Sequence, residues 1–171
     1  NWFISHLNGS VVDYMEDYLE NILMQRFKSE KFLKDKLKYT ENRINILKKQ
    51  PEDWYTEYKI ENWVLNHLDI MDELQYSLDD IYNYCQKYWK YSRIRNYYIS
   101  ICISQKNYNY AIELLNQSLQ LDVNKPGFIV EYRTKLKELY KQTNNDEAYR
   151  QQLWQLVTKD KPGDLDNFNE L

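Results

Sequence analysis

The sequence predicts an all-α fold, a right-handed superhelix of antiparallel helical hairpins, and three observations lead to this prediction. The 171 residues include only three Gly and three Pro, too few for the many turns of a β protein. Apolar residues recur every three or four positions along most of the chain, as in amphipathic helices. The only alanines are Ala111 and Ala148, and Pro-Gly pairs begin at Pro126 and Pro162, so both features recur after 36 or 37 residues. A period of this length is typical of stacked helical hairpins.

Two helices are expected before residue 50, as a less regular pair over residues 1–49. Asn8-Gly9-Ser10 is predicted to form a turn and a cap, and Ser29 to cap the second helix. The apolar stripe of the first helix consists of Val12, Met15, Leu19, Ile22, Leu23 and Phe27, and that of the second consists of Leu33, Leu37, Ile44 and Leu47. Nine Lys or Arg against three acids between Arg26 and Lys49 indicate a basic face on the second helix.

Residues 50–171 are expected to form regular hairpins. Pro51 suits the first turn of a helix over about 51–73, and the Ser77 to Asp80 spacing is that of a capping box that starts a helix over 77–89. Core-like spacing in the first of these helices is shown by Trp54, Tyr58, Leu65, Leu68 and Met71. The following helices are predicted over 93–105 and 108–122, over 128–143 and 146–159, and then in a truncated last helix. The whole chain is therefore interpreted as one helical-repeat domain, 1–171.

The segment Ala111-Ile112-Glu113-Leu114-Leu115, with the leucines that follow it, resembles the second helix of a tetratricopeptide repeat (TPR). In such repeats a small residue lets the paired helices approach closely, and Ala148 takes the same place one period later. The tryptophan and glycine expected in the first helix of a repeat are absent. The resemblance therefore implies a TPR-like class of hairpin and not the strict consensus.

Two longer stretches, from His6 to Tyr18 and from Ala111 to Arg150, resemble the C-terminal helical region of bacterial proteins of unknown function that carry a SWIM zinc finger. This resemblance implies that the chain is a fragment of a longer bacterial protein, and that the finger contacts DNA or protein partners. The Cys-x-Cys and Cys-x-His pairs of the finger have no counterpart in the sequence. No zinc ligand is therefore implied for any residue.

Composition limits the partners and the compartment. A formal net charge of −3 and a pI near 5.5 argue against bulk electrostatic attraction to nucleic acid or to an anionic membrane. No signal peptide or long apolar run is present, so a cytoplasmic protein is expected, with Cys85 and Cys102 as buried, reduced thiols on apolar stripes. The seventeen Tyr fit either a tyrosine-rich binding surface or a coding sequence rich in A and T.

The sequence offers no catalytic motif. His6 and His67 lack the Glu-x-x-His spacing of di-iron bundles, and there is no His-Glu-x-x-His, Cys-x-x-Cys or Gly-rich phosphate loop. Two acidic groups contain oxygen ligands for a hard cation, but their helical spacing favours a solvated face: Glu16, Asp17 and Glu20, and Asp69, Asp72 and Glu73. We therefore expect no enzyme activity, no cofactor and no metal site.

The architecture instead favours binding to an unknown protein or peptide through the first helices of the hairpins, with Tyr55, Trp63 and Arg133 as candidate anchors. The alternative is an accessory nucleic-acid-binding region acting with the absent zinc finger. Its candidate residues are Lys87, Lys90, Arg93 and Arg95, which alternate with Tyr and Trp. A third possibility is a spacer or an intramolecular brace without a partner of its own.

Overall fold

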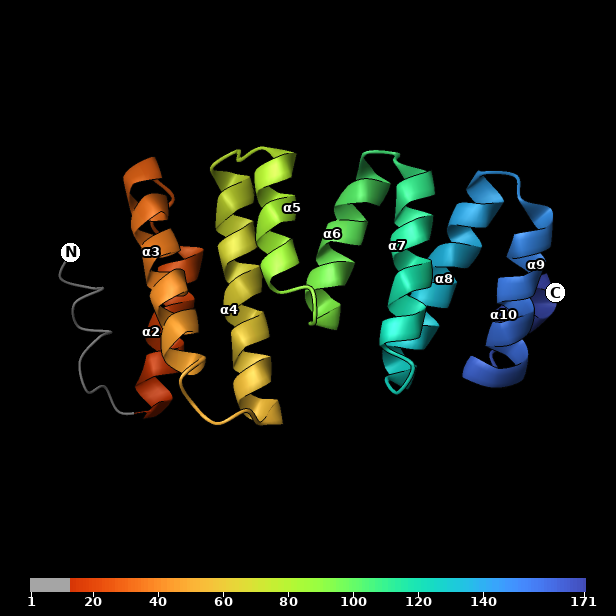
Figure 1. The fold of residues 1–171 in the computed structure, drawn as a ribbon, viewed down its shortest axis with the longest axis horizontal. Coiled ribbons are helices and arrows are strands. Elements are labelled where there is room, and N and C mark those ends of the chain that lie inside the picture. Colours follow the sequence, from red (N-terminus) through yellow and green to blue (C-terminus); the bar gives the residue numbers. More distant parts are fainter. Residues whose placement is uncertain (1–12) are drawn as a thin grey trace. The chain divides into compact units, whose positions relative to one another are not determined.

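The computed structural model describes residues 13–171, which are all-α (Figure 1). The chain divides into two compact units, Asn1–Tyr88 and Trp89–Leu171. The first unit contains α2 (Asp13–Gln25), α3 (Glu30–Leu47), α4 (Trp54–Glu73) and α5 (Leu78–Lys87). The second contains α6 (Ser92–Ser104), α7 (Tyr108–Leu121), α8 (Pro126–Gln142), α9 (Asp146–Gln155), a π-helix η1 (Leu156–Asp160) and α10 (Leu165–Glu170). The predicted turn at Asn8–Ser10, Val12 and the side chain of Met15 lie outside the described residues.

Several helix starts follow the local sequence, but Pro51, which was expected in the first turn of a helix, lies before α4, because Asp53 caps the helix and Trp54 begins it. The Asp53 carboxylate accepts a hydrogen bond of 2.7 Å from the Thr56 amide at the start of α4. Ser77 accepts one of 3.1 Å from the Asp80 amide at the start of α5, as the capping box predicts. Ser29 precedes α3 as expected, but its side chain makes no capping hydrogen bond.

The connections after α4, α6 and α8 share one geometry. In each, a residue with positive φ follows the helix: Gln75 (57°), Lys106 (60°) and Asn144 (56°). The next amide donates back five residues, from Tyr76 to Met71, Asn107 to Cys102 and Asn145 to Tyr140, at 3.0, 2.9 and 2.9 Å. This pattern is the Schellman ending of a helix. Three helices therefore end in the same turn, and each turn leads into the next helix of a hairpin.

The core of the first unit lies between α3, α4 and α5. Its most deeply buried side chains include Ile44, Val64, Leu68, Ile81 and Cys85. The prediction that Trp54 and Tyr58 belong to this core is wrong, because their exposed fractions are 79% and 52%. The buried stripe of α4 includes Thr56, Ile60 and Trp63 instead. Trp54 and Tyr58 each lie two residues from a member of that stripe. Two residues correspond to a rotation of about 200°, so both side chains lie on the opposite face of the helix.

The core of the second unit joins α6, α7 and α8 and contains Ile99, Cys102, Ala111, Leu115, Tyr132 and Leu136. Ala111 is completely buried, as a close approach of two helices requires, but Ala148 is only half-buried. The two alanines therefore differ in environment although they occupy equivalent places in the sequence repeat. Cys85 and Cys102 are buried and form no disulfide, which confirms the prediction of buried, reduced thiols.

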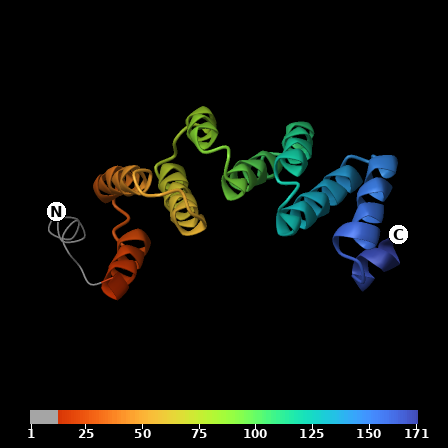
Figure 2. The same cartoon turned by 60° about the horizontal axis from the view of Figure 1, so that its bottom comes forward.

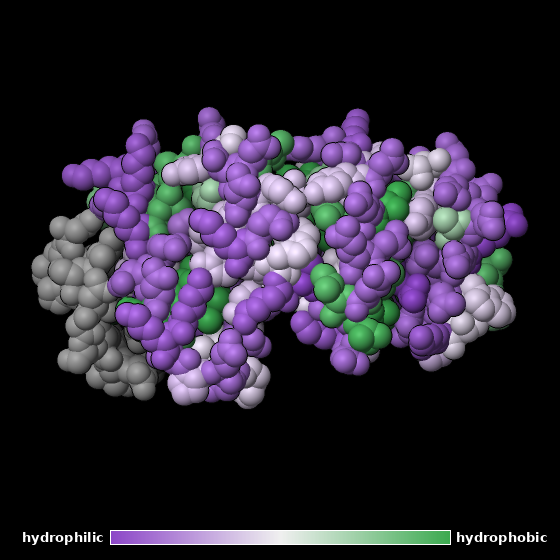
Figure 3. Space-filling view, in the orientation of Figure 1, coloured by the Kyte–Doolittle hydropathy of each residue, from purple (hydrophilic) through white to green (hydrophobic). Residues whose placement is uncertain are grey.

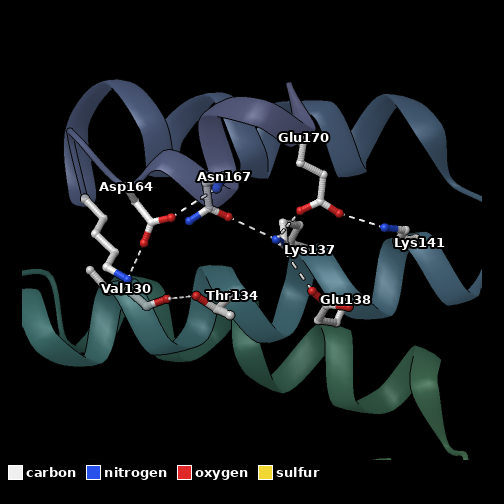
Figure 4. A network of polar contacts seen from close by, with 9 residues as sticks. Val130, Thr134, Lys137, Glu138, Lys141, Asp164, Asn167 and Glu170 are labelled. Atoms are coloured by element: carbon white, nitrogen blue, oxygen red, sulfur yellow. Dashed lines mark hydrogen bonds and ion pairs between the residues drawn. The ribbon is translucent and has the colours of Figure 1, made fainter.

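The C-terminal helix α10 is attached to α8 by polar contacts (Figure 4). Lys137 Nζ donates to Asn167 Oδ1 at 2.9 Å and to Glu170 Oε2 at 2.6 Å, while Lys141 Nζ contacts Glu170 Oε1 at 2.6 Å. Hydrogen bonds from Lys137, Lys141 and Tyr149 lower the pKa of the Glu170 carboxyl to about 2. The apolar residues of this segment, Leu165, Phe168 and Leu171, are exposed.

Candidate partner-binding groove

A groove of about 520 Å³ lies in the first unit between α2 and α4, with a side chain of α3 at its floor. Figure 2 shows α2 and α4 on one side of this unit and α3 and α5 on the other. We call this depression the aromatic groove. Its lining consists of Glu20, Asn21, Met24, Arg43, Tyr55, Tyr58, Lys59, Asn62, Trp63 and Asn66. Its walls are thus the first helices of two successive hairpins, where the sequence analysis expected a partner to bind.

The floor of the aromatic groove is a network centred on Trp63, whose exposed fraction is 6%. The Tyr39 ring meets the indole edge-on, with a centroid distance of 5.6 Å, and the Arg43 guanidinium lies 5.7 Å from the indole centroid. Glu20 of α2 accepts a hydrogen bond of 2.9 Å from the Tyr39 hydroxyl and lies 3.2 Å from Arg43 Nε. These contacts hold the floor in one conformation and fasten α2 to α3.

The rim of the groove carries exposed aromatic rings from α4. Tyr55 and Tyr58 are 50% and 52% exposed. The ring of Tyr55 packs edge-on against Trp54 at 5.7 Å, and Lys59 Nζ lies 4.7 Å from its centroid. Three amide side chains, Asn21, Asn62 and Asn66, complete the lining. Such a surface offers aromatic contact area together with both donors and acceptors, which suits a peptide backbone.

The structure brings together two of the three predicted partner-binding residues. Tyr55 and Trp63 line the same groove, and Trp63 is almost fully buried because it belongs to the core stripe of α4. Arg133 lies in the second unit, where its Nε is 2.5 Å from Asp160 and its Nη1 donates to Gln152 at 3.0 Å. A binding role for these residues remains a prediction.

The sequence did not predict that Glu20, Tyr39 and Arg43 form one network. Glu20 was considered only as a cation ligand, and Arg43 only as one charge on a basic helix. Their association depends on how α2, α3 and α4 pack, and no local spacing in the sequence signals it. The apolar stripes of these helices do indicate which faces meet, but not which polar groups meet at the edge of the contact.

The predicted nucleic-acid-binding residues are divided between the units. Lys87 ends α5 in the first unit, with its Nζ 5.4 Å from the Tyr84 centroid. Lys90, Arg93 and Arg95 belong to the second unit. Arg95 is 1% exposed, so the expectation that it contacts phosphate is wrong. Its guanidinium donates to the Trp89 carbonyl at 2.5 Å and pairs with Asp122, and these contacts hold it inside the unit.

Asp122 is the centre of this buried network. It accepts a hydrogen bond of 2.7 Å from the Tyr132 hydroxyl, and Lys125 Nζ lies 3.3 Å from its other oxygen. Burial raises the pKa of the Asp122 carboxyl, but hydrogen bonds from Arg95, Tyr132 and Ser92 outweigh this and lower it overall. Burial and the hydrogen bond to Asp122 raise the pKa of Tyr132. The arrangement ties the ends of α6 and α7 to α8 and is structural.

His67 is buried in the first unit and makes structural contacts there. Its Nδ1 is 2.8 Å from the Thr40 hydroxyl, and its ring stacks on Tyr84 at 4.2 Å. Burial lowers the pKa of His67 to about 4, so the imidazole is neutral at pH 7. Of the acidic groups considered as cation ligands, the side chains of Glu16 and Asp17 lie outside the described residues, and Glu73 pairs with Lys28. Among the described residues no group of three or more His, Cys, Asp or Glu is placed to hold a metal ion.

Comparisons with protein-family models, with curated proteins and with solved structures find no match to this chain. Within the part of the chain that the structure describes, none of the helices has both the length and the apolar character needed to cross a membrane.

Proposed function

We propose that this chain is a non-catalytic protein-interaction or scaffolding region of a bacterial cytoplasmic protein, and that the aromatic groove binds a peptide segment of its partner. The observation that carries the proposal is the groove itself, in which half-exposed Tyr55 and Tyr58 stand beside a floor held by Trp63, Arg43 and Glu20. Exposed aromatic side chains on a rigid base are typical of binding hot spots, because they contribute contact area while losing little conformational freedom.

The proposed architecture within each unit is TPR-like. The shared Schellman endings of α4, α6 and α8 support it, because each places a short turn between two antiparallel helices. Complete burial of Ala111 in the contact between neighbouring helices supports it as well. The kinship with the SWIM zinc finger proteins stays part of the proposal, and it would make this chain the interaction region of a larger protein.

Binding in the groove would use two kinds of contact. The rings of Tyr55 and Tyr58 would pack against apolar side chains of the peptide. The amides of Asn21 and Asn66 would exchange hydrogen bonds with its backbone, since each amide offers two donors and one acceptor oxygen. Because the Trp63 floor is already held by Tyr39 and Arg43, little ordering of the protein would accompany binding.

The test is selection of peptides from a random displayed library on the 171-residue chain, followed by titration of the selected peptides. Tyr58→Ala is expected to weaken binding about tenfold or more, as loss of a hot-spot aromatic does. Trp154→Ala is the matched control, because Trp154 is a comparably exposed aromatic in the second unit. Equal loss in both variants, or no loss in either, would contradict the proposal.

The nucleic-acid alternative is tested in the same preparation with labelled single-stranded DNA at low and moderate salt. Steeply salt-dependent binding that Lys87→Glu, Lys90→Glu and Arg93→Glu abolish together would replace the peptide proposal if no selected peptide binds the aromatic groove. Absence of DNA binding at low salt, with peptide binding sensitive to Tyr58→Ala, supports the proposal.

A further inference from the structure

The helix α10 turns its polar side toward the rest of the second unit and its apolar side toward solvent. None of the residues of α10 is buried. Leu165, Phe168 and the following Leu171 are 72%, 60% and 52% exposed, and Figure 3 shows apolar side chains at this end of the unit among mostly hydrophilic ones. A surface helix ordinarily turns its apolar stripe toward the core. Little apolar burial therefore holds α10 in place.

Polar contacts attach α10 instead, and they meet at three side chains that we call the lysine site: Lys137 and Lys141 of α8 and Tyr149 of α9 (Figure 4). Lys137 is only 7% exposed, and its Nζ donates to Asn167 Oδ1 at 2.9 Å and to Glu170 Oε2 at 2.6 Å. Lys141 Nζ and the Tyr149 hydroxyl donate to the same carboxylate. The site therefore holds a carboxylate with three donors and an amide oxygen with one of them.

The charges of α8 and α10 are complementary. α8 carries four Lys or Arg and two Glu, whereas α10 carries one Asp, one Glu and no basic residue. Among the described residues, Glu138 is the other acidic residue paired with either lysine, at 3.6 Å from Lys137 Nζ and with its side chain 53% exposed. Without Glu170, Lys137 and Lys141 would share this one carboxylate and keep a net positive charge. The lysine site therefore selects an anionic group.

We propose that the lysine site binds an acidic helical segment of a partner protein, and that α10 occupies the site as an exchangeable intramolecular ligand. The partner segment has the chemistry of the present occupant, a carboxylate and an amide three residues apart on one helix face, as in Asn167 and Glu170. Polar contacts near the surface are weakened by water and salt, so α10 can leave without disturbing the apolar core of α6, α7 and α8. Occupation by α10 lowers the apparent affinity for the partner by the fraction of molecules in which the site is open.

The probe is a fluorescein-labelled peptide of residues 162–171, titrated with the 171-residue chain and followed by fluorescence anisotropy. Glu170→Gln in the protein removes the charge-assisted bonds of α10, so the peptide is expected to bind this variant about tenfold more tightly than the wild-type chain. A second peptide, with Gln in place of its Glu, is expected to bind the same variant about tenfold more weakly. Equal binding by the variant and the wild-type chain, or equal affinity of the two peptides, would overturn the proposal.

Three further variants locate the binding. Asp166→Asn is the matched control, because it removes the same charge from an exposed position of α10, and it is expected to leave peptide binding at the wild-type level. Lys141→Gln added to Glu170→Gln removes one donor whose side chain is 59% exposed, and it is expected to abolish the tighter binding. Tyr58→Ala is expected to leave peptide binding unchanged, so that failure of the lysine site is distinguishable from failure of the aromatic groove. Tighter binding in Asp166→Asn, or tighter binding that persists after Lys141→Gln, contradicts the proposal.

Two other occupants are tested in the same preparation. The proposal expects that an oligothymidine does not displace the peptide and that the wild-type chain sediments as a monomer at micromolar concentration. Displacement by the oligothymidine at lower concentration than by unlabelled peptide would assign the lysines to phosphate groups. Dimerisation that Glu170→Gln abolishes would assign them to α10 of a second copy, and either result contradicts the proposal.

Discussion

Each unit of the chain contains a network of one arginine, one acidic residue and one tyrosine, and the two networks differ in how deeply they are buried. In the first unit Tyr39 donates to Glu20, and Arg43 pairs with the same carboxylate at the floor of a groove. In the second unit Tyr132 donates to Asp122, and Arg95 pairs with that carboxylate inside the core. The Arg43 and Glu20 side chains are 19% and 13% exposed, against 1% and 2% for Arg95 and Asp122. An arginine, an acid and a tyrosine thus build either the floor of a binding groove or a buried brace, and the depth of burial decides which.

The largest difference between the units is expected from removing each arginine. Arg95→Met leaves Asp122 as a buried charge without its main partner, and the free energy of unfolding should fall by about 3–5 kcal/mol. Arg43→Met leaves Glu20 partly accessible to water and still hydrogen-bonded to Tyr39, so the expected loss is smaller, about 1–2 kcal/mol. Urea denaturation followed by Trp fluorescence measures both. Similar losses in the two variants would contradict the contrast between brace and floor.

A second substitution sharpens the first. Combining Arg95→Met with Asp122→Leu removes both charges, and the double variant should be more stable than Arg95→Met alone, because no unpaired charge is left in the core. If the double variant is less stable than either single variant, the network contributes through packing and not through charge pairing.

The next largest effect concerns the two alanines. Ala111→Leu inserts three carbons into a completely buried contact of α7 and should cost about 1–3 kcal/mol of stability through overpacking. Ala148→Leu is the matched control at the half-buried equivalent position in α9, and its expected cost is below about 1 kcal/mol. Thermal unfolding monitored by circular dichroism distinguishes them. Equal costs would mean that α9 packs as closely as α7.

The pH dependence of stability tests the burial of His67 in the first unit. Its pKa of about 4 in the folded state lies below the ordinary value of 6.5, so the unfolded state binds more protons between these two values. Stability should therefore fall as pH decreases from about 6.5 to 4, by up to about 3 kcal/mol. In His67→Gln this part of the pH dependence should disappear. A variant that keeps the full slope over this range assigns it to other groups.

The smallest expected effect is local to the second unit. The Glu170 carboxyl has its pKa lowered to about 2 from 4.5, so its contacts with Lys137 and Lys141 are present above pH 4.5 and are lost as pH falls toward 2. Glu170→Gln should release α10 from α8 at neutral pH without unfolding the unit, because the core there consists of apolar residues of α6, α7 and α8. Hydrogen exchange of residues 165–170 measures the release. Unchanged exchange would show that Asn167 and Asp164 suffice to hold the helix.

Most helices could be predicted from the sequence within a few residues, because caps and apolar spacing are local signals. Asp53, Ser77 and Asn145 accept hydrogen bonds from the amides three residues later, at 2.7, 3.1 and 3.2 Å, and so mark the beginnings of α4, α5 and α9. The errors arose where the partner of a helix face had to be known. Trp54 and Tyr58 fit an apolar spacing, yet α4 turns a different stripe toward α3.

The candidate sites were less predictable for the same reason. Tyr55 was identified from its place on a first helix, and it does lie on a groove. Arg95 was assigned to an exposed basic cluster because neighbouring residues are basic, but Asp122, 27 residues later, draws it into the core. Lys36 shows the same effect on the basic helix α3, since its Nζ donates to the carbonyl of Arg26 at 2.6 Å and is buried there. Charge counts along the chain do not reveal such distant partners.

The sequence by itself determined the helical class, the positions of the turns and the reduced, buried cysteines, because these depend on backbone propensity, capping and hydrophobic period over a few residues. Only the tertiary structure decided which Arg, Tyr and Trp side chains are accessible and which grooves they line. Accessibility depends on which helix faces meet, and a rotation by one or two residues exchanges a core position for a surface one. The division of similar Arg, acid and Tyr networks between a groove floor and a core brace is therefore a property of packing.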